Sequence, residues 1–268
     1  MMNIRKTAKF LTLLIPNKKK RKLSSQKVEN FLHKLFNTEH YRCEQIYQKV
    51  CNNNKSIGFD KYHLISLGYN CFGRMTFNYW GLKPRKADGE RTMPFDISIH
   101  PLDSVISIIE NNFSDYLDDI EYREQDNYWI NKKYNIFFVH DHENDRKTFE
   151  ERYKARITSF CDAIKDDVPT MFFCYTDKKA DAKEINQLNN VLSKICTHKK
   201  YKLIYMIFNN HIPAGIDNNI ATYQANYPQE YAHMDINSKY KYSGLNFEKG
   251  IVDFTYDELI KLLDNKKA

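Results

Sequence analysis

The sequence predicts an α/β fold, a three-layer sandwich with a mostly parallel sheet flanked by helices and preceded by a helical N-terminal segment. Two observations lead to this expectation. From residue 62 onward, short apolar segments alternate with longer segments whose apolar residues recur at helical spacing. Several of the short segments are uninterrupted apolar runs, such as Ile136–Val139 and Met171–Cys174, and strands covered on both faces have this composition.

The expected elements follow these patterns in chain order. A first helix begins at Ser25, a good capping residue, and a second lies near Tyr41–Val50, followed by a linker at Asn52–Lys55. Strands are expected at Tyr62–Leu67, Asn135–Val139, Thr170–Tyr175, Leu203–Phe208 and Ile251–Phe254. Further helices are expected at Cys71–Trp80, Leu102–Asn111, Phe149–Ile164, Ala180–Ile195 and Tyr256–Leu263. The chain therefore divides into a tail (residues 1–24), a helical segment (25–60) and an α/β domain (61–268).

The composition limits the classes to which the protein can belong. With 42% hydrophobic and 28% charged residues among 268, the chain has enough apolar side chains for a packed core. No apolar run approaches the ~18 residues that a membrane-spanning helix needs. The formal net charge of +7 arises in the tail, because residues 1–28 contain nine Lys and Arg and no acidic residue, against 32 basic and 34 acidic residues elsewhere. The nearly neutral remainder argues against binding to nucleic acid.

The tail has an apolar stretch, Phe10–Pro16, between the basic clusters Arg5–Lys9 and Lys18–Lys22. The second basic cluster and the lack of a small-residue cleavage site argue against a secretory signal peptide. We expect residues 1–24 to hold the protein peripherally on an anionic inner membrane face; the alternative is a solvated terminus without order. The six cysteines lack zinc-type or redox spacing, as is typical of reduced thiols in the cytoplasm.

The segment His63–Arg74 contains the first candidate for chemistry. A strand leads into Gly68, and a helix begins near Cys71. A thiol at a helix N-terminus lies among unpaired backbone N–H groups at the positive end of the helix dipole, and both favour the nucleophilic thiolate. The same N–H groups can stabilise an oxyanion. The alternative interpretation is a small buried cysteine that packs beneath the helix.

A second candidate is His140, at the end of an expected strand. Its imidazole would then lie at the sheet edge where Cys71 also lies, and it could deprotonate the thiol. Asp96 and Asp141 are both candidates to orient the imidazole, although Asp141 points to the opposite face of an extended segment. Asp96 alternatively braces a loop. His140 and His142 resemble a pair of metal ligands, but a third ligand is missing, so no metal is expected.

Arg152 and Arg156 share one face of the expected helix Phe149–Ile164. Two guanidinium groups on one face suit a phosphate or a carboxylate, and the alternative is a solvated face with glutamate neighbours. The chain has no glycine-rich dinucleotide loop after its first strand, no P-loop and no Gly-x-Ser-x-Gly elbow. These absences argue against dinucleotide oxidoreductases, NTPases and ordinary serine hydrolases, and no cofactor is expected.

Four motifs together resemble a family of bacterial proteins described as papain-like cysteine peptidases (DUF1796). They are, in order, Ser66–Cys71, Pro94–Asp96, His140-Asp141 and the helix Glu151–Phe160, and the resemblance covers residues 62–210. It implies that Cys71 is the nucleophile and His140 the base. No Gln stands shortly before Cys71, so Asn70 or backbone N–H groups would have to receive the oxyanion. The parallel sheet also differs from the helical lobe and antiparallel barrel of papain-like folds.

The sequence therefore predicts a cysteine-dependent hydrolase or acyl-type transferase, with a glycan or peptide-like substrate that the sequence does not identify. The resemblance also implies that the protein acts in bacterial surface-glycan biosynthesis. The candidate site residues are Cys71, His140, Asp96 and Asp141 for catalysis and Asn70, Arg152 and Arg156 for substrate binding. One alternative is a sugar-nucleotide- or phosphate-binding transferase in which Cys71 is structural. The other is a non-catalytic protein that interacts with the membrane surface.

Overall fold

The computed structural model describes residues 3–13, 15–229, 231–232 and 241–264. The chain divides into two compact units. The first contains Met1–Val50 and Pro228–Asn246, and the second contains Cys51–Tyr227 and Phe247–Ala268. Among the described residues, no helix is both long enough and apolar enough to cross a membrane.

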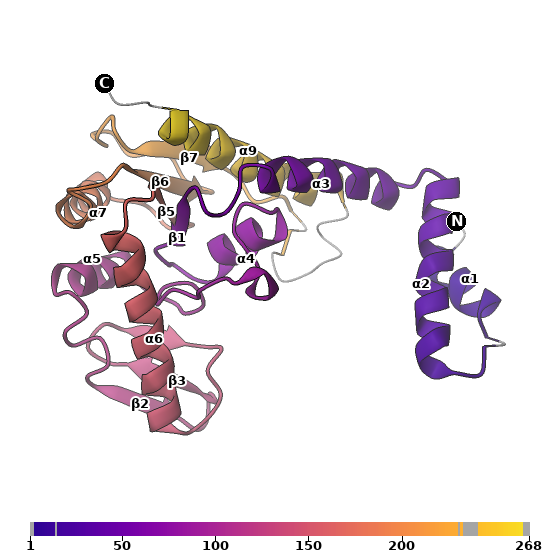
Figure 1. Ribbon diagram of the computed structural model, residues 1–268, viewed down its shortest axis with the longest axis horizontal. Coiled ribbons are helices and arrows are strands. Elements are labelled where there is room, and N and C mark those ends of the chain that lie inside the picture. The colour runs from indigo at the N-terminus through magenta and orange to yellow at the C-terminus, as the bar shows by residue number, and fades with distance from the viewer. Residues whose placement is uncertain (1–2, 14, 230, 233–240, 265–268) are drawn as a thin grey trace. The chain divides into compact units, whose positions relative to one another are not determined.

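The second unit is built on a four-stranded parallel sheet in the order β1-β5-β6-β7 (Figure 1). Its strands are β1 (His63–Ser66), β5 (Thr170–Thr176), β6 (Tyr201–Phe208) and β7 (Ala221–Ala225). Ser66 pairs with Phe173, and Phe173 pairs with Ile204. Because all four strands run in the same direction, their carboxyl ends lie along one edge, where α/β proteins place their ligands. The predicted parallel sheet is confirmed.

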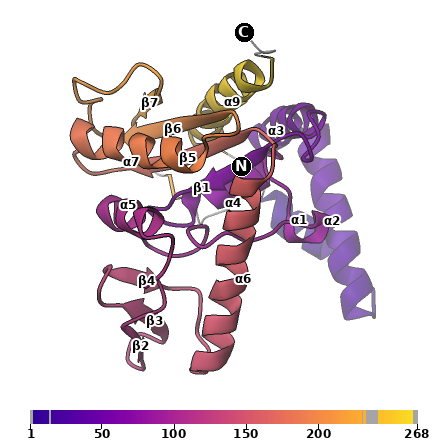
Figure 2. The same ribbon diagram turned by 60° about the vertical axis from the view of Figure 1, so that its left-hand side comes forward.

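Helices cover both faces of this sheet, as the α/β prediction requires. On one face, side chains from the sheet join one apolar core with residues of α5 (Leu102–Glu110), α6 (Arg146–Lys165) and α7 (Ala182–Ile195). On the other face lie α4 (Phe72–Tyr79) and the C-terminal part of α9 (Tyr242–Asp264). There the ring centroids of Phe77 and Phe173 are 4.7 Å apart, and those of Phe208 and Phe247 are 5.3 Å apart. Figure 2 shows α5 and α9 on opposite sides of the sheet.

A separate antiparallel sheet contains β2 (Ile120–Arg123), β3 (Tyr128–Asn131) and β4 (Ile136–Phe138). The strand expected at Asn135–Val139 therefore exists, but it does not belong to the parallel sheet. Two isolated bridges connect this region to the exit of β1: Tyr69 pairs with His100, and Ile99 pairs with Phe137. The segment around His100 thus runs between the chain that follows β1 and strand β4.

One expected strand is wrong. Ile251–Phe254 lies within the helix α9, where Leu245, Ile251, Val252, Leu259 and Leu262 are buried at helical spacing. The hydroxyl of Thr255 donates to the carbonyl of Ile251 at 2.8 Å, a contact of helical backbone. A short apolar run is compatible with a buried strand or a buried helix, and here the spacing of its apolar neighbours over the whole segment decides for the helix.

The N-terminal helices also begin and end at other residues than expected. The first unit contains α1 (Ile4–Leu11) and α2 (Lys18–Leu35), and α3 (Glu39–Lys55) continues from the first unit into the second. Asn17, not Ser25, caps α2, because its side chain accepts a hydrogen bond from the N–H of Lys20 at 3.0 Å. The expected linker at Asn52–Lys55 is the last turn of α3.

Candidate functional site

Cys71 lies at the carboxyl edge of the parallel sheet, where β1 passes into α4. Gly68 makes the turn with φ of +93°, and a Cβ on this residue would lie 3.1 Å from the Cβ of His100. Glycine is therefore favoured here by both its backbone conformation and the close neighbour. Cys71 is the N-cap residue of α4, with φ −70° and ψ −4°, and its side chain makes no capping hydrogen bond. The helix start predicted near Cys71 is confirmed.

The side chain of Asn70 is fixed beside this thiol. Its Oδ1 accepts hydrogen bonds from the N–H of Phe72 at 2.8 Å and from the hydroxyl of Tyr175, at the end of β5, at 2.5 Å. No described residue accepts a hydrogen bond from the Nδ2 of Asn70, and none accepts one from the N–H groups of Gly73 and Arg74 in the first turn of α4. The site therefore presents an oriented amide donor and two backbone donors.

Burial, however, dominates the electrostatics of the thiol. Cys71 is only 7% exposed. Its removal from water raises the pKa of the thiol above the usual value, and the backbone N–H contact and the charge of Arg74 offset this only in part. The expectation that the helix start makes Cys71 a thiolate is therefore wrong for the free protein, in which the thiol is protonated at neutral pH.

The structure does not bring His140 into contact with Cys71. His140 is exposed, and no hydrogen bond among the described residues joins its ring to the thiol. The segment that contains Ile99 and His100 separates the two, since it pairs with Tyr69 on one side and Phe137 on the other. Two strand spacings of ~4.8 Å place the bridged backbones of Tyr69 and Phe137 about 10 Å apart. No hydrogen bond between Cys71 and His140 is therefore formed among the described residues of the free protein.

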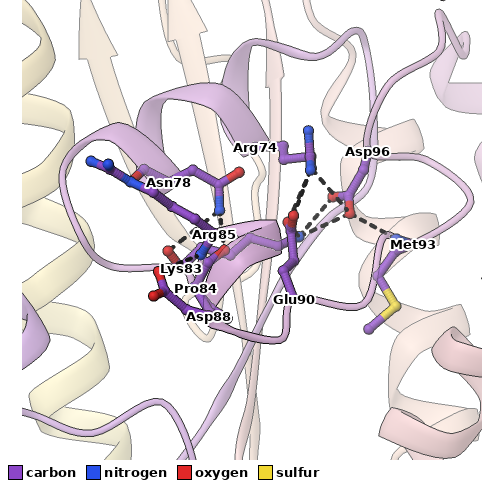
Figure 3. A network of polar contacts seen from close by, with 9 residues as sticks. All are labelled: Arg74, Asn78, Lys83, Pro84, Arg85, Asp88, Glu90, Met93 and Asp96. Atoms are coloured by element: carbon purple, nitrogen blue, oxygen red, sulfur yellow. Dashed lines mark hydrogen bonds and ion pairs between the residues drawn. The ribbon is translucent and has the colours of Figure 1, made fainter.

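Asp96 lies in a buried network of charged side chains (Figure 3). Its carboxylate accepts hydrogen bonds from the Nζ of Lys83 at 2.8 and 3.0 Å and from the N–H of Met93 at 2.7 Å. Arg74 pairs with Glu90 in the same network, through Nε and Oε1 at 3.0 Å. Asp96 therefore braces the loop after α4, the alternative that the sequence left open, and its oxygens make no hydrogen bond to His140.

Asp141 is also engaged, in contacts with helix α6. Its buried carboxylate accepts hydrogen bonds from the hydroxyl of Tyr153 at 2.9 Å, from the Nη1 of Arg152, and from the Nη1 of Arg156 at 3.5 Å. Arg152 also binds Glu143 at 2.7 Å. Both guanidinium groups therefore bind carboxylates of the protein itself. This arrangement ties the end of β4 to α6 and gives no support to a phosphate site at the two arginines.

Sequence reasoning missed a pocket of about 290 Å³ at the carboxyl edge. It is lined by residues that follow β1 and β5 and by the beginnings of α5 and α7, among them Tyr69, Tyr175, Lys178, Lys179 and Glu184. These residues belong to no recognisable motif, and only the rule that ligands bind at this edge pointed to the region.

His100 also lines this pocket and is completely buried. Its Nε2 lies 2.9 Å from the hydroxyl of Tyr116, and its Nδ1 has no hydrogen-bond partner among the described residues. Burial lowers the pKa of His100 to about 3, so the imidazole is neutral. In the part of the chain that the structure describes, no three His, Cys, Asp or Glu side chains are grouped to hold a metal ion.

Comparison with known proteins identifies the family. The model of the family described as putative papain-like cysteine peptidase (DUF1796) matches residues 62–211, which include β1, the Cys71 turn, Asp96, His140 and β6. No curated protein and no solved structure matches the chain. The match spans more than half of the 268 residues, so the chain belongs to the DUF1796 family.

Proposed function

We propose that this protein is a cysteine hydrolase that cleaves an acyl bond, an amide or an ester, with Cys71 as the nucleophile. One observation carries the proposal: at the carboxyl edge of the sheet, the thiol of Cys71 begins helix α4 beside the amide of Asn70, whose oxygen is held by Phe72 and Tyr175. Membership of a family described as cysteine peptidases agrees with this choice of nucleophile.

In the proposed reaction, His140 takes the proton from the thiol of Cys71 while the sulfur forms a bond to the carbonyl carbon. The oxyanion then receives hydrogen bonds from the Nδ2 of Asn70 and from the N–H groups of Gly73 and Arg74. As the intermediate collapses, the bond to the leaving amine or alcohol breaks and the imidazolium returns the proton to it. Water hydrolyses the thioester by the same sequence and restores the thiol. An acceptor other than water would give acyl transfer.

The proposal requires His140 to approach Cys71 when substrate binds. Catalytic hydrogen bonds are often long or absent in free enzymes and form in the substrate complex. His140 is exposed, and no described residue holds its ring by a hydrogen bond. The raised pKa of Cys71 fits such a resting state, because the thiol remains protonated until a base reaches it.

The pocket at the carboxyl edge would hold a part of the substrate away from the acyl group, because Cys71 and Asn70 do not line it. Lys178 and Lys179 lie at this pocket and favour negative charge there, and Tyr175, which also lines it, donates a hydrogen bond to the amide of Asn70. The resemblance adds bacterial surface glycans or their precursors as the source of the substrate, and this part of the proposal rests on the resemblance alone.

Hydrolysis of activated esters and of fluorogenic peptide amides with acidic side chains tests the proposal. Cys71→Ala is expected to abolish turnover, and His140→Gln to reduce kcat by a factor on the order of 10² or more. Cys161→Ala is the matched control, because Cys161 is a half-buried thiol of α6 whose pKa burial also raises. Turnover that persists in Cys71→Ala and disappears in Cys161→Ala would refute the assignment.

A further inference from the structure

Helices α1 and α2 present most of the large apolar side chains that the protein exposes. Phe10 is 71% exposed, and Phe31 and Leu35 are 61% and 62% exposed. Of the exposed large hydrophobic residues in the described part of the chain, all but Ile212 lie between residues 10 and 36: Phe10, Leu11, Leu13, Leu23, Phe31, Leu35 and Phe36. We call these seven residues and the lysines beside them the α1–α2 surface. Exposed aromatic and leucine side chains gathered in this way indicate an interaction surface.

The apolar residues of α2 alternate with lysines on a single face. At 100° per residue, Leu23, Phe31 and Leu35 fall within a sector of about 120°, and Lys20, Lys27 and Lys34 fall within the same sector. All six of these side chains are exposed. A helix whose apolar and cationic residues share one face is suited to the boundary between an apolar and a polar phase. The aliphatic stems of the lysines lie along the apolar phase, and their ammonium groups reach into the polar phase.

A strongly cationic groove lies between α1 and α2. It encloses about 910 Å³, and Figure 1 shows the two helices side by side. Its basic residues are Arg5, Lys9, Lys18, Lys19, Arg21 and Lys22, and the one acidic residue that lines it is Glu29. At 100° per residue, Lys22, Ser25 and Glu29 of this groove lie on the opposite side of α2 from Leu23, Phe31 and Leu35. The groove therefore adds to the positive charge of the segment, and the face that carries the exposed apolar residues has its own lysines.

The N-terminal segment of residues 1–50 is positively charged as a whole. Residues 1–50 contain 12 of the 41 Lys and Arg of the chain and 3 of its 34 Asp and Glu. This charge argues against a second copy of the same surface as the occupant, because the two copies would repel each other. Nucleic acid would satisfy the cations, but it would leave the exposed Phe and Leu side chains in water. An anionic lipid surface satisfies both kinds of residue.

We propose that the α1–α2 surface binds anionic membranes, with lipid phosphates at Lys20, Lys27 and Lys34 and the exposed Phe and Leu side chains on the same face of α2 inserted at the level of the headgroups. The surface extends beyond residues 1–24 along α2 as far as Phe36. This mode of binding needs no membrane-spanning helix. This inference does not depend on the catalytic role proposed for Cys71.

Co-sedimentation of the full-length protein with vesicles tests the inference. Vesicles of phosphatidylcholine with about 30% phosphatidylglycerol should carry the protein into the pellet, and vesicles of phosphatidylcholine alone should not. The triple substitution Lys20→Gln, Lys27→Gln and Lys34→Gln should weaken binding roughly 100-fold, because each lysine near an anionic surface contributes about a fivefold change. The double substitution Phe31→Ser and Leu35→Ser should weaken it roughly tenfold or more.

Two matched controls show whether binding depends on the α1–α2 surface in particular or on the charge and exposed apolar area of the protein as a whole. The first control removes three positive charges, as the α2 variant does, but from exposed positions of α6: Lys147→Gln, Lys154→Gln and Lys165→Gln. The second control, Ile212→Ser, removes an exposed apolar residue outside the α1–α2 surface. Both controls should bind as the wild type does. Circular dichroism of each variant shows whether its helices are retained.

Several results would overturn the inference. The wild type could remain in the supernatant with anionic vesicles, or the α6 control could lose as much binding as the α2 triple variant. Binding that is unchanged by the Phe31 and Leu35 substitutions would indicate charge attraction without insertion, and the proposal would then be wrong. Tighter binding to a DNA duplex than to anionic vesicles would identify nucleic acid as the partner and would also refute it.

Discussion

The hydroxyl of Tyr175 donates a hydrogen bond to the Oδ1 of Asn70 at 2.5 Å, across 105 positions in the sequence. This contact joins the end of β5 to the turn that follows β1. It fixes the plane of the Asn70 amide and thereby the direction of the Nδ2 that we assign to the oxyanion. The geometry of the proposed site therefore depends on two strands, although the motif that identifies it lies on one.

Loss of this hydrogen bond should lower the rate of acyl hydrolysis more than it lowers the free energy of unfolding. Tyr175→Phe removes one of the two hydrogen bonds that hold the Asn70 amide, and we expect kcat/KM for acyl hydrolysis to fall about tenfold, less than when an oxyanion donor is removed outright. The free energy of unfolding should change by only about 1 kcal/mol. Tyr223→Phe is the control, since Tyr223 on β7 does not line the pocket and its hydroxyl makes no hydrogen bond to a described residue. Equal losses in both variants would contradict the role given to Tyr175.

Arg74 should control the ionisation of Cys71. The positive charge of Arg74 partly offsets the effect of burial on the pKa of the thiol. Arg74→Gln removes that charge and leaves Glu90 paired with Lys83 alone, at 3.7 Å, and both changes disfavour the thiolate. The pH profile of iodoacetamide alkylation at Cys71, followed by mass spectrometry, should therefore shift to higher pH. Arg91→Gln, which removes a charge that is exposed and pairs with Asp162, should leave the profile in place. A shift to lower pH in Arg74→Gln would be inconsistent with this electrostatic account.

The buried pair of Lys83 and Asp96 should be strongly coupled. Their side chains are 6% and 0% exposed, so Lys83→Met removes the nearer cation and leaves the buried carboxylate with Arg74 alone, whose Nε is 3.9 Å from the Oδ2 of Asp96. We expect this variant to lose about 3–5 kcal/mol of unfolding free energy. The double variant with Asp96→Asn should be more stable than Lys83→Met alone, because the buried charge that has lost its nearer cation is gone. Urea denaturation measures both. Additive losses would show that the two side chains do not stabilise each other.

His100 should make the fold sensitive to acid. Burial lowers its pKa to about 3, whereas an unfolded histidine titrates near ~6.5. The unfolded state therefore gains a proton between these values that the folded state does not, and stability that is complete above ~6.5 falls as the pH is lowered. At about pH 5.5 the wild type should have lost about 1.4 kcal/mol more than His100→Gln, relative to neutral pH. Urea denaturation at the two pH values measures this difference, and an equal acid loss in both proteins would contradict it.

The parts of the fold that the sequence predicts well are those with a local signal. Strands β5 and β6 are continuous apolar runs, and α6 and α7 repeat apolar residues at helical spacing. The edge strand β7 (Ala221–Ala225) was missed, because it contains Thr222 and Gln224 and is largely half-exposed. The strand expected at Ile251–Phe254 was wrong, because four apolar residues in a row do not distinguish a strand from a buried helix.

In the candidate site, too, the features with a local sequence signal were predicted and the others were not. The position of Cys71 at a helix start is local, since strand, glycine and helix follow one another within ten residues, and it was predicted correctly. The protonation state of the Cys71 thiol was not predicted correctly, because the pKa of the thiol depends on how completely distant segments of the chain exclude water from it. The partners of Asp96 and Asp141 were also missed. Lys83 and Arg152 stand 13 and 11 residues away from them, and only packing decides which cation reaches which carboxylate.

The central claim is that Cys71 is the nucleophile, and its most direct test is the location of a covalent adduct. The protein is treated with one equivalent of an acidic peptidyl vinyl sulfone, and the modified cysteine is identified by digestion and mass spectrometry. We predict an adduct on Cys71, although it is 7% exposed and Cys161 is more accessible, and we predict that His140→Gln slows its formation. Modification of Cys161 before Cys71, or an adduct at Cys71 whose rate is the same in His140→Gln, would contradict the proposed mechanism.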